Sequence, residues 1–138
     1  MKKIVLFFAI LLTNFCFGQQ TATIIDQENR KCLESVTPAT ISTVKCEQEA
    51  LASWQKLMDE VLLQLKANPK KSSVQLLFDS QTHWVKFQKA DLAYYQAFYH
   101  KLYEGGTMTM AAVATHEKNQ FRERTFHLLS FLEALQEE

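Results

Sequence analysis

The chain has 138 residues, of which 47% are hydrophobic and 22% are charged, and this is the composition of one globular domain with a hydrophobic core. Fifteen basic side chains balance fifteen acidic ones, so the net charge does not point to a nucleic-acid-binding surface or a polybasic membrane patch. Three glycines and two prolines are too few for the turns of a β-sandwich, barrel or β-helix, so we expect an all-α fold.

The first eighteen residues have the pattern of a signal peptide. Lys2 and Lys3 precede an apolar run, and the segment ends in the small residue Gly18, so we predict cleavage after Gly18. A membrane anchor is the alternative, but the apolar run is too short to span ~30 Å of hydrocarbon comfortably. We therefore expect residues 19–138 to form a helical domain in the periplasm or outside the cell, without stable membrane insertion after cleavage.

Removal of residues 1–18 changes the charge and the cysteine count. The remaining 120 residues contain thirteen basic side chains, fifteen acidic ones, and two cysteines, Cys32 and Cys46. An even pair in an oxidising compartment is expected to form a disulfide, which stabilises a loop of this size by ~3 kcal/mol. A CxxC redox pair has closer spacing, and a zinc site needs more ligands nearby. We interpret the pair as a structural staple that holds an N-terminal arm onto the first helix.

Apolar residues recur at spacings of three and four in three runs, which predicts three helices. The first begins at Thr37-Pro38 and stops at Asn68-Pro69. The second begins after Ser72 or Ser73 and ends at Gly105-Gly106, and the third continues to the end of the chain. Short connections between helices of similar length favour antiparallel neighbours. The sequence therefore predicts an up-down-up antiparallel three-helix bundle with a disulfide-tethered N-terminal arm.

Polar side chains interrupt the apolar faces of two predicted helices: Gln81 and Gln88 in the second, and Glu117 and Arg124 in the third. If the second hairpin turns at Gly105-Gly106, antiparallel pairing sets Gln88 opposite Arg124. A buried polar group without a partner costs ~1–3 kcal/mol, so these side chains need partners. One interpretation is a polar layer that fixes the register of the bundle. The other is a site for a small ligand or a metal between the helices.

Motifs that carry catalysis are absent from the sequence. It contains no P-loop, no GxGxxG, GxSxG or HExxH motif, and its four histidines are dispersed. We therefore expect no enzyme, no cofactor and no metal site.

Aromatic residues crowd the end of the second predicted helix, just before the glycine turn. Tyr95, Tyr99 and Leu102 fit the core seam, whereas three other side chains fall off it: Tyr94, Phe98 and Tyr103. A wide apolar face that packs the first helix and the arm explains this composition. The alternative is a protein-binding surface beside the turn, because tyrosine offers large contact area at a low entropy cost.

Four features in order resemble the LprI-like lysozyme-inhibitor family, whose members are small secreted or lipid-anchored bacterial helical proteins. They are the Cys32 and Cys46 pair, Gln81-x-x-Trp84-x-x-Phe87, Gly105-Gly106-Thr107-Met108 and Arg124-x-x-x-Leu128. The chain departs from the family where Trp54 and Met58 replace a common Asp and Asn. The second cysteine pair of the family is also absent, and Leu92 and residues 111–114 stand in its place.

The resemblance implies a protein partner, a lysozyme, and no catalytic residue. The expected binding residues are Gln81, Trp84, Gly105, Gly106, Thr107, Met108 and Arg124. The leading hypothesis is an exported, non-enzymatic protein-binding domain that inhibits lysozyme in the cell envelope. The alternatives are a carrier of a small ligand or metal in the polar layer, and a structural component of an envelope complex. Nothing indicates a nucleic-acid partner.

Overall fold

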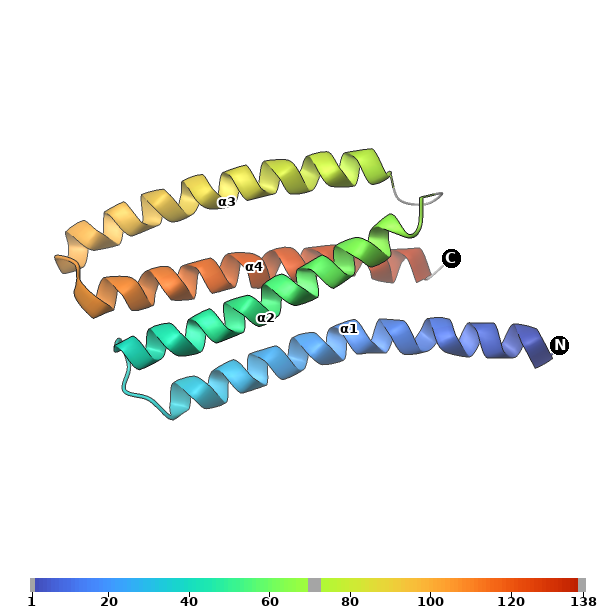
Figure 1. The fold of residues 1–138 in the computed structure, drawn as a ribbon, viewed down its shortest axis with the longest axis horizontal. Coiled ribbons are helices and arrows are strands. Elements are labelled where there is room, and N and C mark those ends of the chain that lie inside the picture. Colours follow the sequence, from blue (N-terminus) through green and yellow to red (C-terminus); the bar gives the residue numbers. More distant parts are fainter. Residues whose placement is uncertain (1, 70–72, 137–138) are drawn as a thin grey trace.

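The computed structural model describes residues 2–69 and 73–136, and these residues form four α-helices and no strand. The helices are α1 (Lys2–Glu34), α2 (Ile41–Lys66), α3 (Val74–Tyr103) and α4 (Gly106–Gln136). Successive helices alternate in direction, as the short connections predict (Figure 1). The all-α fold is thus confirmed. The three-helix bundle is wrong, because a fourth helix takes the place of the arm.

The segment expected to be an arm is the C-terminal part of α1. Ala22, Ile25 and Asn29 follow one another at spacings of three and four, and all three side chains are buried. This narrow face packs against α2 and α4, which explains why the segment is a helix. The Cys32–Cys46 disulfide is confirmed, with its Cα atoms 5.7 Å apart, and it joins α1 to the first turns of α2.

α2 begins three residues later than the Thr37-Pro38 pattern predicts. Its N-cap is Thr40, which has an extended backbone, and the preceding Ala39 has a positive φ of 59°. The Thr37 carbonyl accepts hydrogen bonds from the hydroxyls of Thr40 at 2.7 Å and Thr43 at 3.1 Å. These bonds fold residues 37–40 into a turn that precedes the helix, so the predicted start is wrong.

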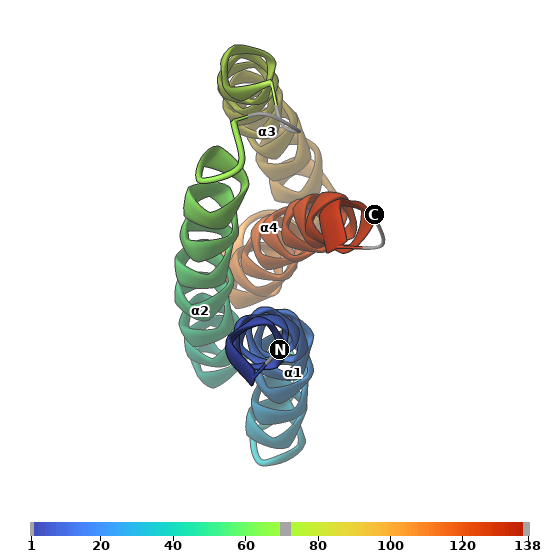
Figure 2. The ribbon, with the colours of Figure 1, turned by 90° about the vertical axis from the view of Figure 1, so that its right-hand side faces the viewer.

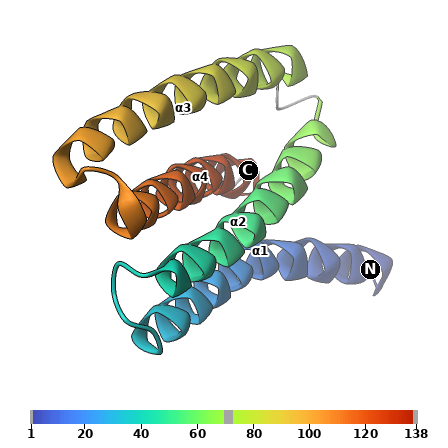
Figure 3. The ribbon, with the colours of Figure 1, turned by 60° about the vertical axis from the view of Figure 1, so that its left-hand side comes forward.

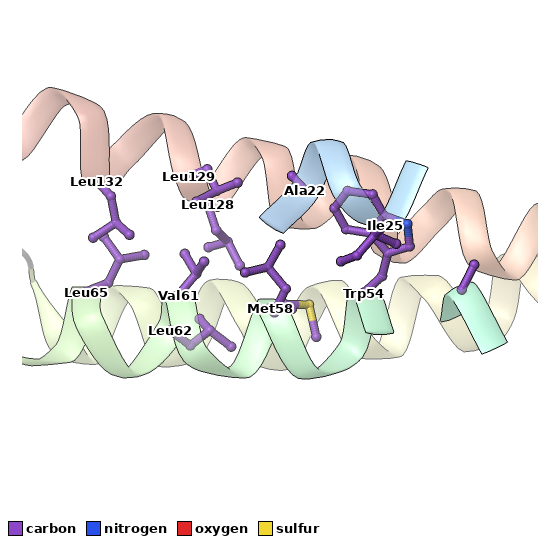
Figure 4. Close-up of a cluster of buried hydrophobic side chains, with 12 residues drawn as sticks. Ala22, Ile25, Trp54, Met58, Val61, Leu62, Leu65, Leu128, Leu129 and Leu132 are labelled. Carbon is purple, nitrogen blue, oxygen red and sulfur yellow. The ribbon is translucent and has the colours of Figure 1, made fainter. Parts of the chain in front are cut away.

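The hydrophobic core lies between α2 and α4, with α1 covering one end (Figure 4). Burial of each large side chain there contributes ~1.5–3 kcal/mol relative to exposure. Trp54 is fully buried, and its ring centre lies 5.4 Å from that of Phe126. The other large members of the core are Ile25, Leu57, Met58, Val61, Leu62, Leu65, Leu128, Leu129 and Leu132.

α3 lies outside this core and packs mainly on α4. Seen end-on, α3 and α1 lie on opposite sides of α4, and α2 runs along a third side (Figure 2). Figure 3 shows that α2 and α3 approach each other near their connection and then diverge. Gln88 is the single buried residue of α3. Most of the surface of α3 is therefore free of contact within the described part of the chain.

The expected ends of α3 are confirmed where the structure describes them. Ser73 is the N-cap, while the other candidate, Ser72, lies outside the described residues. At the other end, Glu104 is left-handed with φ 53°, and Gly105 and Gly106 have φ values of 81° and 77°. Glycine adopts the latter two values without strain, because it has no Cβ. The chain therefore reverses within three residues, and α4 begins at Gly106.

Candidate binding surface

The residues expected to bind a partner fall into two separate groups. Gln81 and Trp84 on α3 lie beside Arg124 on α4, in the middle of the α3–α4 contact. Residues 105–108 form the turn at the far end of the same helix pair. Nineteen residues of helix separate Trp84 from this turn, which corresponds to ~30 Å at 1.5 Å per residue. The expected residues therefore do not form one site.

Arg124 fixes the middle of α3 against α4. Its Nε donates a hydrogen bond of 3.1 Å to Gln81 Oε1, and its Nη2 donates one of 3.0 Å to Ser80 Oγ. The guanidinium carbon also lies 5.8 Å from the ring centre of Trp84. Burial lowers the pKa of Arg124 from its ordinary value, because the charged form loses water contacts that neutral partners replace only in part. The arrangement holds the two helices in register.

The predicted pairing of Gln88 with Arg124 is wrong by about one helical turn. Gln88 instead donates a hydrogen bond of 3.3 Å to Gln120 Oε1. Trp84 packs edge-on against Phe121, with ring centres 5.1 Å apart. The shift arises because the glycine turn is tighter than expected and α4 already begins at Gly106. Gln81 also reaches α2, where its amide nitrogen lies 3.6 Å from the sulfur of Met58.

A second polar group links α3 to α4 beside Leu92, and the sequence did not reveal it. Asp91 Oδ2 lies 2.8 Å from His116 Nε2 and accepts a hydrogen bond of 2.7 Å from Gln120. The ring of Tyr95 stacks on His116 at 3.8 Å. The pKa of Tyr95 is raised to about 12. Burial is the main cause, and a hydrogen bond with Tyr99 is the second. Leu92 stands at one of the positions where the resembled family has its second cysteine pair. In this chain, the polar contacts beside Leu92 connect α3 to α4 instead.

The glycine turn is anchored from inside and exposes its next two residues. The Thr109 hydroxyl donates a hydrogen bond of 3.2 Å to the Tyr99 carbonyl, and Thr109 is buried. Gly105 has a φ of 81°, which favours glycine, and an added Cβ there would lie 3.0 Å from the ring of the exposed His100, which would have to shift. Thr107 and Met108 are exposed. The turn thus presents these two side chains on a fixed backbone.

A row of large apolar side chains runs along the outer face of α3. Leu76, Phe87, Tyr94 and Phe98 follow one another at spacings of eleven, seven and four residues, which place them on one helix face. We call these four residues the α3 stripe. Each exposes between 49% and 71% of its surface, and the row is ~33 Å long at 1.5 Å per residue.

The aromatic residues near the end of α3 divide largely as the sequence predicts. Tyr95 and Tyr99 are partly buried toward α4, whereas Tyr94, Phe98 and Tyr103 are exposed. Leu102 was expected in the core seam, but it is more than half exposed. The chain turns back into α4 only three residues later, so nothing in the described part of α4 reaches over Leu102. The exposed surface therefore continues from the α3 stripe to the turn.

A groove between α2 and α3 is a further apolar surface that the sequence analysis missed. It has a volume of about 370 Å³ and is lined by Leu62, Lys66, Leu77, Phe78, Gln81, Thr82, Val85 and Lys86. The signal was present in the run Leu76-Leu77-Phe78, because three consecutive apolar residues exceed the width of one helix face. Leu77 points to the core side, while its two neighbours remain exposed.

A protein family described as lysozyme inhibitor LprI matches residues 32–128 of the chain. No curated protein and no solved structure matches it. Among the residues that the structure describes, no helix is long and apolar enough to cross a membrane. Within the same residues, no group of three or more His, Cys, Asp or Glu side chains is placed to hold a metal ion.

Proposed function

Because this chain belongs to the LprI lysozyme-inhibitor family, we propose that it is an exported, non-catalytic domain that binds a protein partner, and that the partner is a lysozyme. The family match covers more than half of the chain, including the disulfide, both polar groups between α3 and α4, and the glycine turn. The signal-peptide pattern of residues 1–18 supports export to the compartment where lysozymes act.

The observation that carries the proposal is the α3 stripe. A helix of 30 residues buries a single side chain yet exposes four large apolar ones in one row. Large apolar side chains exposed together on one face mark protein-binding sites on soluble proteins. Aromatic side chains also contribute most to binding energy at such interfaces. We assign the contact with the partner to the α3 stripe and its continuation through Leu102 to Met108.

The other expected binding residues support this surface from beneath. Gln81, Trp84 and Arg124 hold α3 on α4, and Gly105 and Gly106 fix the turn. We propose that they position the contact surface and do not themselves touch the partner. A carrier function in the polar layer has less support, because Gln81, Gln88 and Arg124 each bind other protein groups. An envelope-complex role would use the same α3 stripe with a different partner.

The test compares changes in the α3 stripe with a change at an equally exposed leucine outside it. Protein from the full-length gene, purified after export, is added to cell-wall suspensions treated with c-, g- and i-type lysozymes. We expect it to slow lysis by at least one of them, and Leu76→Ser combined with Tyr94→Ser to weaken inhibition at least tenfold. Leu63→Ser is the matched control, since Leu63 on α2 is 66% exposed and Leu76 is 68% exposed.

The melting temperature should stay unchanged in all variants, because these side chains contact little. Unchanged lysis by all three lysozymes at excess protein would rule out the lysozyme partner. A pull-down from envelope extract with wild-type protein and the stripe variant then tests the envelope-complex role.

A further inference from the structure

A buried polar cluster lies where α1, α2 and α4 meet, next to the disulfide. Asn29, Glu47 and Lys118 each come from a different helix, and each exposes only between 3% and 9% of its surface. Lysine and glutamate are almost never buried to this extent unless they are paired. The cluster is far from the α3 stripe in the fold, and the proposed binding function does not use it.

The three side chains touch one another in every combination. Lys118 Nζ lies 3.2 Å from Glu47 Oε2 and donates a hydrogen bond of 3.3 Å to Asn29 Oδ1. Asn29 Nδ2 donates to the same Glu47 Oε2, also at 3.3 Å. The second carboxylate oxygen of Glu47 accepts a hydrogen bond of 3.0 Å from Thr115. One carboxylate oxygen therefore contacts both the amine and the amide nitrogen.

An amine, a carboxamide and a carboxylate held in this way are the reactants of an amide exchange. We propose that Lys118 and Asn29 become joined by an isopeptide bond between Nζ and Cγ, with Glu47 carrying protons between the two nitrogens. The new bond links α1 to α4, just as the disulfide links α1 to α2. Three of the four helices then form one covalently closed unit.

The reaction balances within the cluster. Glu47 takes a proton from the ammonium group of Lys118, and the freed lone pair of Nζ attacks Cγ of Asn29 as the C=O electrons move to Oδ1. Glu47 returns this proton to Nδ2, the carbonyl re-forms, and the Cγ–Nδ2 bond breaks, releasing ammonia. Nζ then gives its surplus proton to Glu47, which ends protonated. No oxidant or co-reactant is needed, and no charge remains in the interior.

The reacting atoms need to move only slightly. Asn29 Cγ is one C=O bond of ~1.2 Å beyond Oδ1, so it lies at most ~4.5 Å from Nζ. Attack requires about 3–3.5 Å, so Nζ has to move at most ~1–1.5 Å toward Cγ. Once the two groups are at that distance and aligned, the effective concentration of the amine reaches as much as ~10⁵–10⁸ M.

The bond also lowers the cost of burying this cluster. A buried ion pair recovers its desolvation cost only with excellent geometry, whereas the isopeptide bond removes the charge of Lys118.

Peptide mass spectrometry tests the bond directly. The exported full-length gene product is folded for several days at neutral pH, reduced, and digested with trypsin. We expect a linked species that contains the peptide ending at Arg30 and residues 102–122, one ammonia lighter than the two together and uncut after Lys118. The intact mass alone is insufficient, because a new N-terminal Gln19 also loses ammonia when it cyclises.

Two glutamate variants test the route. Glu47→Gln should abolish the linked peptide, whereas Glu49→Gln, an exposed position on the same helix, should retain it. Circular dichroism checks that both variants are helical. Separate peptides with cleavage after Lys118 in the wild-type digest would overturn the proposal, whatever the variants do. A linked peptide that persists in Glu47→Gln would overturn the role of Glu47 as the proton carrier.

Discussion

Tyr95 shows how a single side chain reports on the contact between α3 and α4. Its ring stacks on His116, and its pKa is raised from 10.0 to about 12, chiefly by burial and then by Tyr99. The folded protein thus holds this proton more tightly than the unfolded chain does. The linked stabilisation is present below pH 10 and is lost as the pH rises from 10 toward about 12.

We therefore expect Tyr95 to form phenolate late in an alkaline absorbance titration of the native protein. Tyr95→Phe should remove this late step. Tyr94→Phe is the matched control and should retain it, because Tyr94 is 71% exposed on the outer face of the helix. Identical titration curves for the wild type and Tyr95→Phe would show that the stacked phenol ionises like any other.

At the scale of the helices, α2 and α3 have similar lengths but very different burial. Eleven residues of α2 are buried, compared with one residue of α3. Regions with few buried contacts open at a lower free energy than the core does. α3 is therefore the element whose amides are expected to exchange first.

The expected hydrogen-exchange pattern follows from this difference. Amides in the middle of α3 should exchange at least about tenfold faster than those in the middle of α2, which corresponds to ~1.4 kcal/mol. Exchange mass spectrometry of the native protein measures both. Arg124→Ala should accelerate α3 further and leave α2 unchanged, since Arg124 binds Gln81 and Ser80. Equal protection of α2 and α3 would mean that they open as one unit.

The helices that sequence reasoning found are those with long apolar periodicity. The runs ending at Leu65 and beginning at Val74 are regular enough to fix α2 and α3, and Gly105-Gly106 fixes the turn. The helix that contains residues 19–34 was missed, because its buried face holds only Ala22, Ile25 and the polar Asn29. Such a face becomes visible only when α2 and α4 cover it.

Helical periodicity also decides which features of the candidate surface the sequence can predict. The exposure of Tyr94 and Phe98 follows from their positions off the seam. The distance between Trp84 and Gly105 follows from the length of the helix that joins them. The expected binding residues nevertheless included both, because they were taken from family motifs without regard to that distance. The contact of Glu47 with Lys118 joins residues 71 positions apart, and no local pattern encodes a pairing of that kind. Tertiary packing decides it.

At the scale of the whole molecule, α1 is held by its narrow buried face and by a few polar contacts with α2 and α4. One of these is the ion pair of Asp26 with Arg122, at 2.7 Å, in which both side chains are partly exposed. Pairs of that kind contribute only ~0–1 kcal/mol. The disulfide adds a covalent link between α1 and α2 to these contacts.

Reduction of Cys32–Cys46 should lower the free energy of unfolding by ~3 kcal/mol, because the loop of fourteen residues regains its entropy in the unfolded chain. Urea unfolding with and without reductant measures the change. Cys32→Ser combined with Cys46→Ser should behave as the reduced protein in both conditions. An unchanged midpoint on reduction would show that other links hold α1 in place.

The close contact at Gly18 imposes an order on the biogenesis of the protein. α1 runs through Gly18 without a break, and an added Cβ there would lie 3.0 Å from Leu129 of α4. Proteases cut exposed, flexible chain, and a helix docked this closely offers none. If the chain is cut after Gly18, as the sequence predicts, the cut must come before α1 docks. Maturation and folding would then be consecutive events, and docking of α1 before the cut would protect Gly18 from cleavage.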